Sequence, residues 1–203
     1  VVSDQSGRAN IAMMLNDTAF DKELSKDQVA DLLGRVKEKE AEGLTYDGAE
    51  ASFELLARSV AAPFPPFFVL DRFRVIDERR HNRLGELVVE AVALVTLELG
   101  PESKMEAETG NGPVDALNKA LRKALTSAYP CLEDMRLTDY KVRILDSKSG
   151  TEAITRVMIE SNDSQGRTWH TVGISTNIID ASYKALYDAF TWKLIQEGAR
   201  AIV

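Results

Sequence analysis

The chain has 203 residues, 44% hydrophobic and 28% charged, which is enough for one core or for a core with a small helical annex. Its 25 basic and 32 acidic residues give a net charge of −7, which argues against nucleic acid as a partner because phosphate contacts need clustered Lys and Arg. Every apolar run is shorter than the roughly 18 residues of a membrane span, and no secretory signal is visible. The single cysteine, Cys131, excludes an internal disulfide framework. We therefore expect a cytoplasmic protein with no nucleic-acid or membrane partner, and the start at Val1 without an initiator Met predicts a chain cropped from a longer protein.

Residues 1–62 have the patterns of a small all-helical subdomain. Ser25-Lys26-Asp27-Gln28 has the form of a capping box, and the apolar residues after it recur at helical spacing. Gly43 ends this helix, and Asp47-Gly48 turns the chain into a second amphipathic helix. Residues 63–66, Pro-Phe-Pro-Pro, can continue neither a helix nor a central strand, so they form the predicted linker.

Residues 67–203 are predicted to form one domain of strands and helices. Strand-like segments rich in aromatic and β-branched residues or with alternating apolar residues are Phe67–Ile76, Leu87–Leu99 and the shorter Lys104–Thr109. A helix then opens at Gly110-Asn111-Gly112-Pro113 and extends to about Ala128, since Pro suits the first helical position.

The same order of elements recurs in the second half of this region. Matching segments are Phe73–Asp77 with Val142–Asp146, Glu90–Val92 with Glu152–Ile154, Val95–Glu98 with Val157–Glu160, and Pro113–Leu121 with Ile178–Leu186. In the two helices Asp, Ala, Lys, Ala and Leu are identical at a constant offset of 65. One βββα unit would leave a sheet face and a helix stripe uncovered, so the two halves should pack together. The predicted fold is therefore α+β, with duplicated βββα units after the helical subdomain, and two similar halves favour a symmetric homodimer.

A catalytic or metal site cannot be assembled from this sequence. His81 and His170 lack a Cys, a His or a paired carboxylate at metal-ligand spacing, so we expect a solvated loop residue and a strand-face residue. Cys131 has no neighbouring base or helix N-terminus that would lower its pKa. A P-loop and a dinucleotide fingerprint are absent, and Gly173–Asn177 lacks the second glycine of a nucleophile elbow.

The repeat instead places two helix N-termini in equivalent positions. Gly112 and Asn177 align as N-cap residues, and Asp115 and Asp180 follow three residues later. The simpler interpretation is that these aspartates complement the positive helix ends. The same geometry would also suit an α-amino acid, because free N–H groups at a helix start bind a carboxylate and an aspartate can hold an ammonium group. Gly110 and Gly112 would let the backbone approach such a ligand, and apolar surface would come from Val114, Ala116, Ile178 and Ile179.

The segment Gly110–Ala116, with the sequence Gly-Asn-Gly-Pro-Val-Asp-Ala, resembles a motif of the C-terminal regulatory domain of the 2-isopropylmalate synthase family. Ala49–Leu56, Met135–Arg143 and Gly173–Ser182 look like the citramalate synthase branch of that family. Ser3–Asn10 resembles the segment that follows the catalytic barrel in the same branch, so the resemblance covers essentially the whole chain.

This resemblance implies a duplicated βββα regulatory domain that dimerises and binds an end-product amino acid. The parent enzyme would carry an N-terminal TIM barrel with a divalent metal that condenses acetyl-CoA with a 2-oxo acid, which is pyruvate for citramalate. The metal-binding His-x-His of the family is missing here, so we expect no cofactor in this chain and no activity from it alone. The implied effector is isoleucine; the alternatives are leucine, as in 2-isopropylmalate synthases, and a purely structural dimerisation tail without a ligand. The implied effector-site residues are Gly110, Asn111, Gly112, Val114, Asp115 and Ala116 and, resting more on the repeat, Ser175, Asn177, Ile178 and Asp180.

Overall fold

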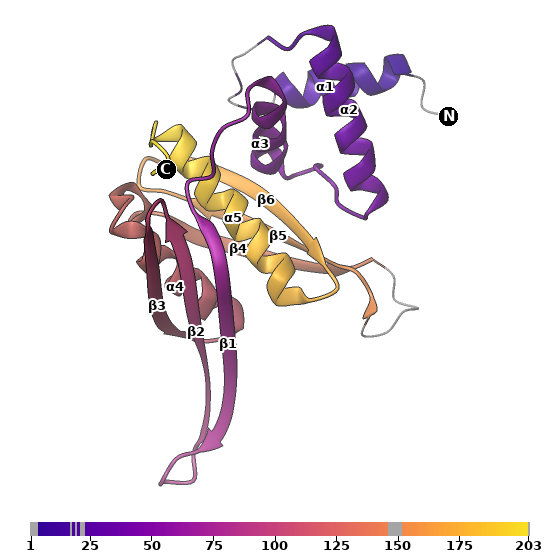
Figure 1. The fold of residues 1–203 in the computed structure, drawn as a ribbon. Coiled ribbons are helices and arrows are strands. Elements are labelled where there is room, and N and C mark those ends of the chain that lie inside the picture. The colour runs from indigo at the N-terminus through magenta and orange to yellow at the C-terminus, as the bar shows by residue number, and fades with distance from the viewer. Residues whose placement is uncertain (1–3, 17, 19, 21–22, 146–151, 203) are drawn as a thin grey trace. The chain divides into compact units, whose positions relative to one another are not determined.

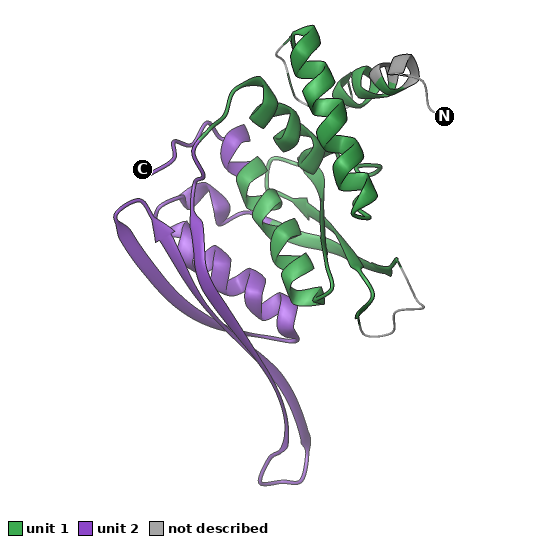
Figure 2. Ribbon diagram, turned by 45° about the vertical axis from the view of Figure 1, so that its right-hand side comes forward, with its two compact units in different colours: residues 1–64, 136–192 green, residues 65–135, 193–203 purple. Residues whose placement is uncertain are grey.

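The computed structural model of the chain describes residues 4–16, 18, 20, 23–145 and 152–202 (Figure 1). Ser3 and Asp146, which belong to two of the sequence matches, lie outside the described residues. Residues 1–64 with 136–192 form one compact unit, and residues 65–135 with 193–203 form the other (Figure 2). We call these unit 1 and unit 2. The predicted division into residues 1–62, 63–66 and 67–203 stays a prediction.

Three helices open the chain, and the last two are the helices that the capping box and the apolar spacing predict. They are α1 (Asp4–Asn16), α2 (Lys26–Ala41) and α3 (Glu50–Ala61). The capping box at the start of α2 is confirmed: the Gln28 N–H donates to Ser25 Oγ at 3.3 Å, and the Ser25 N–H donates to Gln28 Oε1 at 2.9 Å. Shortly after α2, Gly43 has a φ of 101°, a conformation that favours glycine, so the chain turns there as predicted.

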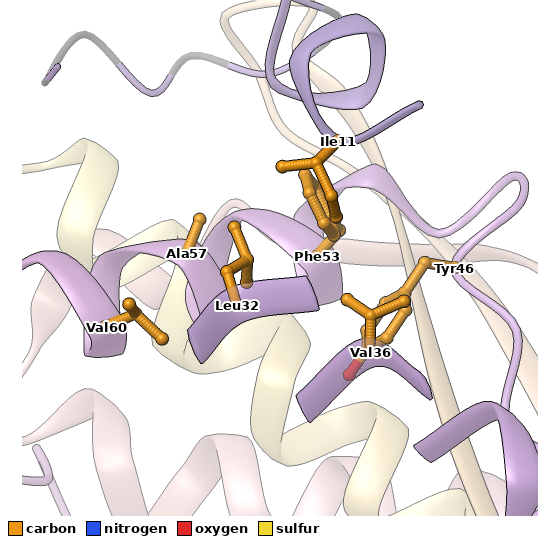
Figure 3. Packing of buried hydrophobic residues seen from close by; sticks show 7 residues of the cluster. All are labelled: Ile11, Leu32, Val36, Tyr46, Phe53, Ala57 and Val60. Carbon is orange, nitrogen blue, oxygen red and sulfur yellow. The ribbon is translucent and has the colours of Figure 1, made fainter. Parts of the chain in front are cut away.

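These helices share a small hydrophobic core (Figure 3). Its buried members come from all three helices and from the segment between α2 and α3: Ile11, Leu32, Val36, Tyr46, Phe53, Ala57 and Val60. The rings of Tyr46 and Phe53 meet edge to face, with centroids 5.7 Å apart. The core therefore fixes the segment between α2 and α3 against the helices on both sides of it.

Unit 2 contains the first βββα unit. Its elements are β1 (Val69–His81), β2 (Leu87–Leu99), β3 (Glu102–Gly110) and α4 (Pro113–Thr126), and the strands form an antiparallel sheet in the order β1-β2-β3. One face of β2, formed by alternate residues from Ala91 to Leu99, is buried. Helix α4 packs on β2 and β3 and buries its own apolar stripe, which includes Leu117, Leu121 and Leu125.

The first strand is longer than its sequence pattern predicts. It continues past Ile76 to His81, which pairs with Leu87 across a turn in which Gly85 has a φ of 79°. The added residues are charged and exposed, so they show no apolar alternation that would reveal a strand. In both views the β1–β2 hairpin extends past α4 (Figures 1 and 2), which explains why these residues are not buried.

The second βββα unit lies in unit 1, except for the last residues of its helix, and confirms the repeat. It consists of β4 (Arg136–Ile144), β5 (Thr155–Asn162) and β6 (Thr168–Ser175), in the order β4-β5-β6, followed by α5 (Ile178–Gln196). The ladder registers agree as well: Phe73 pairs with Val95 in the first sheet, and Val142 pairs with Val157 in the second. Both pairs were matched by sequence alone, so the two units share pairing as well as element order.

One segment of the sequence match is not a strand in the second unit, although the correspondence itself holds: the Leu145 N–H donates to the Ile154 carbonyl at 2.9 Å, at the positions that match the paired Ile76 and Val92. Residues 152–154 were aligned with strand residues of β2, but they precede β5, which begins at Thr155 opposite Ile144. The second hairpin is shorter than the first, and its ladder ends where β4 ends. Ala153 is buried even so, so the apolar residue that suggested a strand packs in the interior without pairing in the sheet.

Helix α3 packs against β6 of the second sheet within unit 1. The Trp192 Nε1–H of α5 donates to Glu54 Oε2 at 2.8 Å, and Glu54 also forms an ion pair with Arg58 at 2.6 Å. The ring of Trp192 stacks on Trp169 of β6, with centroids 4.9 Å apart. These contacts attach the helical segment to the second sheet and its helix.

Among the described residues, no helix combines the length and the apolar composition needed to cross a membrane.

Candidate functional site

The start of α4 holds six of the ten predicted site residues, Gly110, Asn111, Gly112, Val114, Asp115 and Ala116. Gly112 is the N-cap and offers no side chain to the N–H groups of the first turn. Asp115 Oδ2 accepts the Asn111 N–H at 3.0 Å and the Lys119 ammonium at 2.8 Å. Burial raises the pKa of Asp115, but the bonds from Lys119 and Asn111 outweigh it and hold the pKa below its ordinary value. The turn therefore presents backbone donors next to an ionised carboxylate.

The two glycines of this turn have different roles. A Cβ at Gly110 would lie 2.4 Å from the Ala116 nitrogen, so this residue is glycine because β3 and α4 approach each other closely. A Cβ at Gly112 would meet nothing within 4 Å, and its φ of −173° suits any residue. Ala116 is fully buried, which leaves Val114 as the partly exposed apolar residue of the turn. Of the two glycines, only Gly112 borders open space.

The start of α5 holds the other four predicted residues, Ser175, Asn177, Ile178 and Asp180. Asn177 Oδ1 accepts the Ile179 N–H at 2.8 Å and the Asp180 N–H at 3.3 Å, and the Asn177 N–H donates to Ser175 Oγ at 3.1 Å. Asp180 forms an ion pair with Lys184 at 3.0 Å. This helix start therefore satisfies its first N–H groups with its own side chain. The two predicted groups of residues lie in different units, and each is assembled separately.

The structure brings carboxylates to His170 that its sequence neighbours do not supply. His170 Nδ1 lies 2.8 Å from Glu50 Oε1 of α3, and His170 Nε2 lies 3.1 Å from Glu160 Oε2 of β5. Burial lowers the pKa of His170, but the hydrogen bonds and charges of Glu50 and Glu160 outweigh it, so the pKa is raised. Because Glu50 is distant in sequence, only the packing of α3 on β6 reveals this cluster.

The other two residues considered for chemistry have no reactive neighbourhood in the structure. His81 is exposed at the end of β1. Burial raises the pKa of the Cys131 thiol, with a further contribution from the charge of Glu197, so the reactive thiolate is disfavoured. Among residues 4–202 outside the gaps, no three His, Cys, Asp or Glu side chains are grouped to hold a metal ion.

Comparison with known proteins places this architecture in a family. Residues 47–194 match the family described as the LeuA allosteric (dimerisation) domain. The chain belongs to this family. The family resemblance of Gly110–Ala116 and of the longer runs is thereby confirmed.

The curated proteins that are similar to this chain include (R)-citramalate synthases and 2-isopropylmalate synthases. The chain is 45% identical over 195 residues to an (R)-citramalate synthase of Geobacter sulfurreducens and 38% identical over 202 residues to that of Aquifex aeolicus. A 2-isopropylmalate synthase of Yersinia pestis is 31% identical over 191 residues. The alignments cover 96%, 100% and 91% of this chain but 36%, 38% and 32% of these relatives. The chain thus spans about a third of the length of the relatives it matches.

Proposed function

We propose that the chain is the regulatory part of a citramalate synthase and binds a branched-chain amino acid, isoleucine, as a feedback inhibitor. Identities of 45% and 38% to (R)-citramalate synthases, against 31% to a 2-isopropylmalate synthase, support this branch of the family. The parent protein would condense acetyl-CoA with pyruvate on a separate catalytic domain that carries a divalent metal.

The effector proposal rests on the start of α4, where no side chain caps the first N–H groups of the helix. An α-amino acid needs donors for its carboxylate and an acceptor for its ammonium group. The first turn of α4, capped by Gly112 without a side chain, supplies the donors. Asp115 supplies the acceptor: its hydrogen bonds and its ion pair with the described residues all involve Oδ2, which leaves Oδ1 available for the ammonium group. Val114 offers partly exposed apolar surface for an aliphatic side chain.

Homodimerisation is the second part of the proposal. The family description includes dimerisation. Unit 2 exposes large apolar side chains that a monomer would leave in water: Val69, Ile76, Leu84, Leu87, Val89 and Met105. Light scattering at micromolar concentration should give the mass of a dimer, and a stable monomer would contradict this part.

Calorimetric titration with isoleucine, leucine and valine tests the effector proposal, with lysine as a negative control. We expect isoleucine to bind tightest, and saturation at about 100 times its Kd to stabilise the fold by about 2.7 kcal/mol per site. Asp115→Asn should weaken isoleucine binding by about ten- to hundred-fold, since a charge-assisted bond to the ammonium group is lost. Asp180→Asn is the matched control, because it removes an equivalent aspartate beside a helix start that Asn177 already caps.

The alternatives give different results in the same experiment. Tighter binding of leucine than of isoleucine would assign the chain to the 2-isopropylmalate synthases. Absence of binding by all three branched-chain amino acids would leave a structural dimerisation tail, in which Asp115 and Asp180 serve only their helix ends.

A further inference from the structure

Unit 1 contains a cleft of about 550 Å³ that lies outside both predicted groups of site residues. One wall is formed by the segment after α2 and by α3, with Leu44, Tyr46, Ser52 and Leu55. The opposite wall is formed by β6 and α5. The cleft therefore exists only because the helical segment packs on the second βββα unit.

A carboxylate with a single hydrogen bond lies in this cleft. Asp188 of α5 is half-buried, and its Oδ2 accepts the Ser52 hydroxyl at 2.6 Å. Ser52 Oγ in turn accepts the Val172 N–H at 3.0 Å, which directs the hydroxyl proton towards Asp188. Ser52 itself is buried, so the backbone of β6 fixes its orientation.

The cleft supplies no cation to Asp188. Its two lysines have acidic partners of their own: Lys39 lies 2.9 Å from Glu42, and Lys184 lies 3.0 Å from Asp180. The Lys184 ammonium also donates to the Ile174 carbonyl at 3.0 Å. Across the described part of the chain, Asp188 forms no ion pair with Lys or Arg. A half-buried carboxylate with one neutral donor is destabilising unless a cation or a proton reaches it.

The other residues that line the cleft are aromatic and aliphatic, and they suit both the alkyl part and the charged group of an organic cation. Tyr46, Tyr183 and Tyr187 line the cleft together with aliphatic side chains, and the rings of Tyr183 and Tyr187 lie 6.2 Å apart. Burial raises the pKa of all three hydroxyls, so these tyrosines stay neutral and add no charge of their own. Aromatic faces attract ammonium groups, and aliphatic walls exclude water from a short alkyl chain.

We propose that this cleft binds a small aliphatic ammonium compound, with the ammonium group on Asp188 and the alkyl part against the tyrosines and leucines. The carboxylate supplies the charge, Ser52 holds it in position, and the neutralised lysines leave no cationic group for a ligand carboxylate. The preferred ligand class is thus an amine without an acidic group, which differs from the amino-acid effector proposed for the start of α4.

Titration with 3-methylbutylamine and with the neutral 3-methylbutanol, at a pH above the pKa of Asp188, tests this site on the whole chain. We expect saturable binding of the amine and none of the alcohol. Asp188→Asn keeps the size of the side chain and its bond from Ser52, and it should weaken amine binding by about ten- to hundred-fold. Asp139→Asn is the matched control: Asp139 pairs with Lys141 in the same unit, away from the cleft lining, so its loss should leave amine affinity unchanged.

A spectroscopic measurement separates binding at Asp188 from indirect effects. The carboxyl carbon of Asp188, followed by NMR, should titrate at lower pH when the amine saturates the protein, because an ammonium neighbour favours the ionised form. Equal amine affinity in the wild type and Asp188→Asn, or an unshifted Asp188 titration, would overturn the proposal. These results leave the isoleucine titration untouched, because that proposal depends on Asp115 in unit 2.

Discussion

Replacing Asp188 with Asn should change how stability depends on pH. Burial raises the pKa of Asp188 from 3.8 to about 7, and the bond from Ser52 offsets this only in part. Between these two values the folded chain keeps a proton that the unfolded chain releases. Folding therefore takes up a proton, and stability falls as the pH rises from about 4 to about 7. Asn cannot titrate, so the variant should lack this component.

The magnitude follows from the size of the pKa shift. Each pKa unit corresponds to about 1.4 kcal/mol, so the shift from 3.8 to about 7 corresponds to roughly 4 kcal/mol across this range. The Asp188 side chain keeps some solvent exposure, which screens the charge, and we expect about 2–4 kcal/mol. At about pH 8, Asp188→Asn should then be more stable than the wild type by this amount, and at about pH 4 the two should be nearly equal.

Urea unfolding of both proteins at several pH values between about 4 and 8 measures this difference. The difference between the two proteins isolates Asp188, because all other titrating groups are present in both. Parallel stability curves over the whole range would refute the assignment of a raised pKa to Asp188. A variant less stable than the wild type at high pH would show that the carboxylate already has a favourable partner.

Two further predictions concern the histidine cluster and the glycines. Because the pKa of His170 is raised in the folded chain, the pairing of His170 with Glu50 stabilises the fold at pH values below the unfolded pKa, and this stabilisation is lost as the pH rises through the folded pKa. The pair is partly exposed, so the stabilisation amounts to under about 1 kcal/mol. His170→Gln should remove this pH dependence of stability, which thermal unfolding at about pH 6 and 8 measures. Identical pH profiles in the wild type and His170→Gln would contradict the pairing. Gly110→Ala should lower the free energy of unfolding by about 1–3 kcal/mol, because its Cβ would overlap Ala116. Gly112→Ala should lower the free energy of unfolding by under about 1 kcal/mol, but it should weaken isoleucine binding if the effector lies on that turn. Equal losses of stability in the two glycine variants would contradict the roles assigned to them.

The elements with local signals could be predicted from the sequence. Ser25 and Gln28 form the capping box that their spacing indicates, and β2 has the predicted bounds of Leu87 and Leu99. The repeated βββα unit could be predicted for a different reason. Equivalent strands bury the same face against equivalent helices, so Val95 and Val157 are under the same packing constraint.

Features that depend on distant contacts were not predicted. The contact of α3 with β6, the pairing of Glu50 with His170 and the bond from Ser52 to Asp188 all join residues more than a hundred positions apart. Periodicity describes which face of an element is apolar but not which partner covers it. The role of Gly110 shows the same limit of sequence patterns. The glycine indicated that another group approaches the backbone closely, but only the structure shows that this group is the start of α4.

The two helix starts show how a duplicated fold can keep its architecture while its surface chemistry diverges. Both place an aspartate at the third helical position, and both aspartates form an ion pair with a lysine one turn later. The N-cap residue differs: Asn177 uses its carbonyl oxygen on its own helix, whereas Gly112 leaves the first turn of α4 without a side-chain acceptor. A carboxylate ligand would have to displace Asn177 from α5, but it would meet open backbone at α4. One residue type at one position therefore makes α4 the stronger candidate for an effector, although the two copies share the same order of strands and helices.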